Sequence, residues 1–242
     1  MFKNNLINLF IILFSLTLIK PASATLIDFE VSNLGVVGGQ AYNEVSLIVD
    51  GIEVTVTAYN IINDGDGNID SLNLLNADGT GVYVSSSDNL GVVSHDNDGH
   101  HLDGGNDNNV KDDDNSIPDF DEGLLFTFDQ VVRLNYIDFD SFDTFDGYDD
   151  FNLTVDGVLY LADFDIEESS PYASQAFFDD DSKFDFHSIV GTSFLFWADG
   201  NSDGFRIDYF NVTAVPEPNS ILLLALALLF FVMGKRKKSI KR

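Results

Sequence analysis

The sequence contains no cysteine among its 242 residues. This absence excludes disulfide bonds, thiolate metal sites and thiol-based catalysis, so an apolar core must hold the folded chain together. The sequence also lacks the G-x-S-x-G turn of many serine hydrolases, the glycine loop that binds nucleotide phosphates and the H-E-x-x-H zinc motif. Without any of these patterns, we predict that the protein is not an enzyme.

Basic residues are scarce outside the two ends of the chain. The sequence has 12 lysines and arginines against 40 aspartates and glutamates, and eight of the 12 lie within residues 1–20 or 235–242. The segment between these ends therefore carries four basic residues and all 40 acidic ones. A surface with this charge repels phosphate backbones and anionic lipids, which excludes nucleic acid as a partner.

The first 24 residues have the three parts of a signal peptide. Lys3 gives a positive start, residues 6–19 are apolar except for three polar side chains, and Ala22 and Ala24 form an A-x-A cleavage site. The alternative is an uncleaved anchor, but the 14 residues of this run are fewer than the ~20 that span a bilayer. We therefore predict a signal helix that engages the Sec translocon and is removed after Ala24.

The last 29 residues, 214–242, combine three features in a fixed order. The first is a short strip formed by Val215, Pro216, Glu217, Pro218 and Ser220. Its two prolines hold the backbone extended and remove two N–H donors, which suits the cleft of a protease or transpeptidase. Residues 221–233 then predict a short apolar helix, too brief for a permanent anchor, and a basic cluster follows it.

This arrangement closely resembles the PEP-CTERM sorting signal of Gram-negative bacteria. The resemblance rests on the five residues of the strip, the apolar segment and the basic tail. It implies recognition by an exosortase-type processing enzyme, transient residence in the inner membrane and removal of the tail. It also implies delivery to the cell surface or to an exopolysaccharide matrix. The alternative is a plain C-terminal membrane anchor.

Between the two ends, the sequence predicts an all-β domain over residues 25–213. Apolar and polar residues alternate in residues 45–49 and 52–58, and the intervening Asp50-Gly51 predicts a two-residue hairpin turn with positive φ. Asp156-Gly157 predicts a second such turn. About ten short strands and no convincing amphipathic helix predict an antiparallel, jelly-roll-like β-sandwich. The strands are expected at residues 26–31, 45–49, 52–58, 82–85, 124–128, 131–139, 151–155, 158–161, 184–190, 193–198 and 205–213.

One acidic loop resembles the start of an EF-hand calcium site. Asp64, Asp66, Asn68 and Asp70 alternate as oxygen ligands around one hard cation do, although the sixth and twelfth positions lack the glycine and glutamate of an EF-hand. We expect calcium as the cofactor of this loop.

A second acidic stretch, residues 94–122, includes Asp96 and Asp98 as further calcium candidates. Calcium would screen the crowded carboxylates of this stretch and shape a binding face. The alternative is a solvated loop that keeps the protein soluble.

The middle domain is similar to the lectin-like domains often found ahead of this sorting signal. The residues that carry the similarity are 26–30, 90–92, 121–128 and 204–208. The expected function is that of an exported surface or matrix protein, with exopolysaccharide as a partner and a non-catalytic binding or structural role. The alternative is an extracellular polysaccharide hydrolase or lyase.

Overall fold

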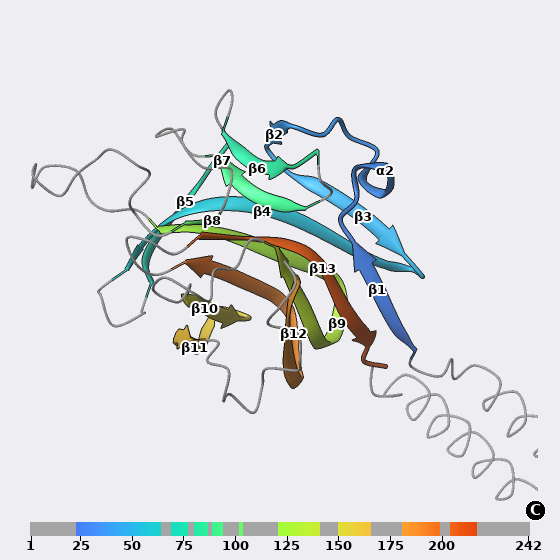
Figure 1. The fold of residues 1–242 in the computed structure, drawn as a ribbon. Coiled ribbons are helices and arrows are strands. Elements are labelled where there is room, and N and C mark those ends of the chain that lie inside the picture. The colour runs from blue at the N-terminus through green and yellow to red at the C-terminus, as the bar shows by residue number, and fades with distance from the viewer. Residues whose placement is uncertain are drawn as a thin grey trace, which may run out of the picture.

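The structure is a computed structural model, and it describes residues 23–63, 69–76, 80–86, 89–93, 102–103, 121–140, 150–165, 181–198 and 204–216. These residues form a 13-stranded antiparallel sheet and one four-residue helix (Figure 1). In chain order the elements are β1 (Ala24–Asp28), α2 (Val31–Leu34), β2 (Gln40–Tyr42), β3 (Val45–Val49), β4 (Ile52–Asn63), β5 (Ile69–Leu74), β6 (Gly81–Val84), β7 (Leu90–Val93), β8 (Leu102–Asp103), β9 (Asp121–Asp140), β10 (Asp150–Val155), β11 (Val158–Asp165), β12 (Asp181–Ala198) and β13 (Gly204–Ala214).

Two long strands, β9 and β12, connect the two layers of the fold. They pair with each other from one end to the other, with Gly123 opposite Trp197 at one end and Asp140 opposite Asp181 at the other. The first half of β9 has β4 on its other side, whereas the second half has β13 there. Both strands curve strongly between these halves (Figure 1). Strands that pass from one layer to the other at a bend are typical of orthogonally packed sheets.

The first layer contains β3 and β5, then β4, the first half of β9, the second half of β12, β10 and β11. The second layer contains the first half of β12, the second half of β9, β13, then β1 and β7, followed by β6 and β2. The predicted all-β, antiparallel sandwich is therefore confirmed. The predicted signal helix and the predicted C-terminal apolar helix lie outside the described residues.

Phenylalanine side chains fill the space between the layers. Phe126 on β9 lies 4.4 Å from Phe210 on β13, measured between ring centroids, and 5.5 Å from Phe29. Phe196 on β12 contacts both Phe126 and Phe210 at 6.1 and 5.6 Å. All four of these side chains are fully buried. Such ring pairs add about 0.5–1.5 kcal/mol each beyond the area that they bury.

Both predicted Asp-Gly turns have the expected geometry. The φ angles are 54° and 82° for Asp50 and Gly51, and 49° and 77° for Asp156 and Gly157. Positive φ at both central residues is the signature of a type I′ turn, whose twist matches that of the flanking strands. The two hairpin predictions are therefore confirmed.

Each hairpin turn lies against the bend of a long strand. Asp129, at the bend of β9, accepts a hydrogen bond from the Glu53 amide at 3.0 Å, and Gln130 donates to the Gly51 carbonyl at 3.1 Å. At the bend of β12, the Asp156 carboxylate accepts four hydrogen bonds from the amides and hydroxyls of Thr192 and Ser193. The turns thus fix the points at which the sheet folds over.

The separation into strands 124–128 and 131–139, and into 184–190 and 193–198, was wrong. Each pair forms one continuous strand, β9 or β12. Register shifts between Asp185 and Ile189 and between Gly191 and Ser193 absorb the bend of β12 without a turn. The chain also leaves the first predicted strand early, because residues 31–34 form the single turn α2. No helix within the described part of the chain has the length and apolar character needed to cross a membrane.

Candidate functional site

The predicted processing sites lie at neighbouring strand ends. β1 and β13 are antiparallel partners, with Ala24 opposite Thr213 and Asp28 opposite Tyr209. β1 therefore begins where β13 ends (Figure 1). The Val215 amide donates a hydrogen bond to the Val131 carbonyl at 2.9 Å, which holds the first residue of the sorting strip on the sheet. Pro216, the next residue, is exposed.

The structure describes only part of the predicted sorting and cleavage residues. Val215, Pro216 and Ala24 are described. Three other residues of the strip and one alanine of the cleavage site lie outside the described residues, namely Glu217, Pro218, Ser220 and Ala22. Their roles stay predictions.

A hydrogen-bonded group of polar and aromatic side chains lies on the outer face of the second layer, and we call it the polar ladder. Its members are Asn135 and Tyr136 on β9 and Tyr209, Asn211 and Thr213 on β13. All five are partly exposed. Their neighbours Ile137, Phe210 and Val212 are fully buried on the opposite, core-facing side. The alternation of strand residues therefore places the polar ladder toward solvent.

Hydrogen bonds fix the amide end of the polar ladder. The Asn135 side-chain amide nitrogen donates to the Asn211 side-chain oxygen at 2.8 Å and to the Thr213 hydroxyl oxygen at 3.0 Å. Asn135 can reach both because a register shift between Asn211 and Val212 leaves Asn135 as an extra residue on β9. The Tyr136 ring lies directly across from Asn211 and packs edge-on against the Tyr209 ring at 6.1 Å.

The Tyr209 hydroxyl donates a hydrogen bond to a buried carboxylate, that of Asp138. Asp138, its neighbour across the strands, is 1% exposed. Burial of the phenol, together with its hydrogen bond to Asp138, raises the pKa of Tyr209 far above its usual value. The hydroxyl therefore stays protonated and donates to Asp138 at every physiological pH. A group that holds its proton this firmly is a poor general base.

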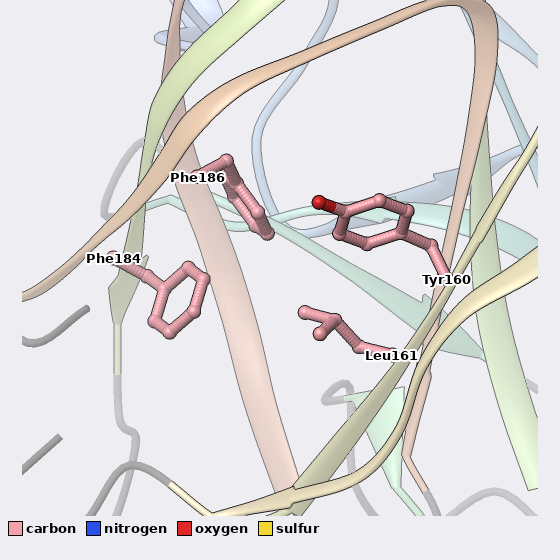
Figure 2. A pocket seen from close by; sticks show the side chains of 4 residues that line it. All are labelled: Tyr160, Leu161, Phe184 and Phe186. Atoms are coloured by element: carbon pink, nitrogen blue, oxygen red, sulfur yellow. The ribbon is translucent and has the colours of Figure 1, made fainter. Parts of the chain in front are cut away.

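A pocket of about 260 Å³ lies at the edge of the sandwich (Figure 2). Tyr160 and Leu161 of β11 point toward Phe184 and Phe186 of β12 across it (Figure 2). Phe184 and Phe186 are buried and contact Phe151 of the core at 5.4 and 6.5 Å. Among the described residues, the pocket is lined by the apolar side chains of Leu161, Phe184 and Phe186 and by the exposed Tyr160, which adds a hydroxyl group.

Of the six calcium candidates, the structure describes only Asp70. Asp70 lies on β5 and is exposed. Within the parts of the chain that the structure describes, no three or more histidine, aspartate or glutamate side chains are grouped so that they could hold a metal ion. The other candidates lie outside the described residues, and these are Asp64, Asp66, Asn68, Asp96 and Asp98. Calcium binding stays a prediction.

Sequence reasoning missed the polar ladder and the pocket. Both depend on which strands become neighbours. For example, β9 and β13 are separated in the chain by three other strands, β10, β11 and β12. The only local signal was the alternation of polar and apolar residues in each strand. This alternation predicts which residues share a face of the strand, but not which strand lies beside it.

Comparison with known proteins bears on the C-terminus of the chain. Residues 214–237 match the PEP-CTERM protein-sorting motif. No curated protein and no solved structure matches the chain. The predicted sorting signal is therefore confirmed, and it begins at Ala214, the last residue of β13.

Proposed function

We propose that this exported protein, which carries a PEP-CTERM signal for exosortase processing, serves at the cell surface or in an exopolysaccharide matrix without catalysing a reaction. The observation that carries the proposal is the direct junction between the β domain and the sorting motif. The motif begins at the residue where β13 ends, so the last strand of the sheet leads into the processing segment without a further domain between them.

The β domain has features of a binding or structural module. Its two layers share two continuous strands and a phenylalanine-rich core, which gives a rigid scaffold. On its outer face, burial and a hydrogen bond to Asp138 raise the pKa of Tyr209, so this hydroxyl stays protonated. These features support a non-catalytic role in which neutral polysaccharide is bound on the surface of the sheet.

Processing can be tested by replacing Pro216, Glu217 and Pro218 together with alanine in a host that contains an exosortase. The triple variant loses the extended, proline-fixed strip. It should therefore accumulate as a membrane-bound precursor that keeps its C-terminal tail. The matched control is Asn219→Ala, which changes the same segment outside the recognised residues and should be processed as the native chain is.

The measurement is mass spectrometry of the C-terminal peptide together with cell fractionation. If the triple variant is trimmed and released like the native chain, the sorting role of this strip is refuted. The non-catalytic role is tested separately by incubating the processed protein with polysaccharides. Retention on them without new reducing ends or unsaturated sugars supports the proposal, whereas product release would support the alternative, a hydrolase or lyase.

A further inference from the structure

We propose that the polar ladder is the binding surface for a neutral polysaccharide chain. The inference deepens the proposed function and rests on it. The surface consists of Asn135, Tyr136, Tyr209, Asn211 and Thr213, joined on β1 by Leu26.

The shape of this surface fits an extended ligand. Tyr209, Asn211 and Thr213 follow one another along β13 at alternate positions, over a length of about 13 Å at ~3.3 Å per residue. Across the strands, Tyr136, Asn211 and Leu26 form one row, since Asn211 is opposite both of the others. Leu26 is 46% exposed, so the row is open to solvent on the β1 side.

The hydrogen-bonding groups of the ladder are positioned before a ligand arrives. The Asn135 side-chain nitrogen donates both of its N–H groups in hydrogen bonds, one to Asn211 and one to Thr213. Among the described residues, these two bonds leave the N–H groups of the Asn211 side chain, the Asn135 side-chain oxygen and the Thr213 hydroxyl hydrogen available to a ligand, and all three residues are partly exposed. Because the side chains are already held in place, a ligand loses less of its binding free energy in ordering them.

The chemistry of the ladder selects a ligand that carries hydroxyl groups and no charge. Sugar hydroxyls are both donors and acceptors, as are the groups that the ladder leaves open. The Tyr136 and Tyr209 rings and Leu26 provide apolar surface for the C–H face of a sugar ring. The carboxylate beside them, Asp138, is buried and already bonded by Tyr209.

The net charge of the chain disfavours anionic polysaccharide on this face, where the exposed Arg133, opposite Thr213, is the basic residue beside the ladder among the described positions of β9. The segment between the two basic ends carries 40 acidic residues and four basic ones. Its field repels polyuronates and sulfated chains, and it is reduced but not removed at physiological salt. A neutral chain meets no such repulsion.

The test is affinity electrophoresis of the purified, processed protein. The gels contain dextran, alginate or chitosan, which are a neutral, an anionic and a cationic polysaccharide. We expect dextran or a comparable neutral glucan to retard the protein at 0.15 M salt. Asn211→Asp keeps the oxygen that Asn135 bonds but removes the two outward N–H donors. It should weaken retardation about tenfold, the size of effect expected when a hydrogen bond of average strength is lost.

Tyr136→Ala should weaken retardation by a similar factor, because it removes a ring from the ladder. The matched control is Tyr160→Ala, which removes an exposed tyrosine from the mouth of the pocket and should leave retardation unchanged. Thermal unfolding of each variant checks that it is folded, and Asn211→Asp provides the test if Tyr136→Ala is not.

Loss of binding in Tyr160→Ala with native binding in Asn211→Asp would place the ligand in the pocket and overturn the inference, while the proposed glycan role would stand. Retardation by alginate or chitosan alone would show that the ligand is charged, and it would overturn the inference that the ladder binds a neutral polysaccharide. Failure of all three polysaccharides to retard the protein would overturn the inference and the glycan role together. Exosortase processing, measured independently, would be unaffected.

Discussion

The Asp156 carboxylate offers a sharp test of how the sheet is bent. Its Oδ1 accepts hydrogen bonds from the Thr192 and Ser193 amides at 2.9 Å each, and from their hydroxyls at 2.8 and 3.3 Å. The equivalent residue of the other hairpin, Asp50, has the same kind of backbone, with φ 54° against 49°. Among the described residues, the Asp50 side chain accepts one long hydrogen bond, from the Thr25 hydroxyl at 3.4 Å. The two aspartates therefore form a matched pair.

Replacing either residue with alanine adds the same backbone penalty. Alanine in the left-handed region costs roughly 1–2 kcal/mol relative to a right-handed conformation, and aspartate tolerates this region better. Asp156→Ala additionally removes a side-chain oxygen from two backbone amides, which resembles the loss of a helix cap and costs about 1 kcal/mol, within a range of ~0.5–2. We expect Asp156→Ala to lower the free energy of unfolding by about 1–2 kcal/mol more than Asp50→Ala does.

The assay is urea unfolding at neutral pH, repeated with Asp156→Asn along a pH series. Partial burial acts in the opposite direction, but the hydrogen bonds from Thr192 and Ser193 lower the pKa of Asp156 below 3.8. A lowered pKa adds stability that is complete above the unfolded value and is lost as the pH falls through the folded one. The stability difference between the native chain and Asp156→Asn should therefore shrink below about pH 4. Equal losses in Asp156→Ala and Asp50→Ala, or a difference that does not change with pH, would refute the reasoning.

Three further predictions follow from the same structure. Phe126→Ala should lower the free energy of unfolding by about 3–5 kcal/mol in urea melts, because it empties the centre of the core; a loss below ~1 kcal/mol would contradict this packing. Gly81→Ala should destabilise the fold far more than Gly51→Ala in thermal melts, because both residues have positive φ but only at Gly81 would the new methyl group overlap the Tyr42 carbonyl; equal melting temperatures would refute the close approach. Millimolar calcium should raise the melting temperature of the processed protein if the acidic loops bind it, and an unchanged melting curve in calorimetry would remove calcium as a cofactor.

The sequence was sufficient for the features that depend on local chemistry. Asp50-Gly51 and Asp156-Gly157 specify their turns because few other residues accept positive φ at both positions. The sorting signal was equally local, since its prolines, apolar run and basic tail follow one another in the chain. Fold class also followed, because the alternation of apolar and polar residues is the main signal for an antiparallel sheet with one buried face.

The features that depend on strand partners could not be predicted. Asp129-Gln130 resembles a turn between two strands, yet these residues lie within β9 and accept and donate hydrogen bonds at its bend. The role of Asp156 in holding β12 was hidden for the same reason, because Thr192 and Ser193 are 36 and 37 residues away. Only the assembled sheet shows that Asp156, a turn residue of one hairpin, also forms hydrogen bonds that hold the bend of β12.

The pairing of the first strand with the last has a consequence for the timing of export. Ala24 and Thr213 lie at opposite ends of the domain sequence, so the sheet cannot close until β13 has crossed the inner membrane. Contacts between such distant segments form late and slowly. In an exported chain, β1 therefore has no partner until β13 arrives on the same side of the membrane, and this part of the sheet closes last.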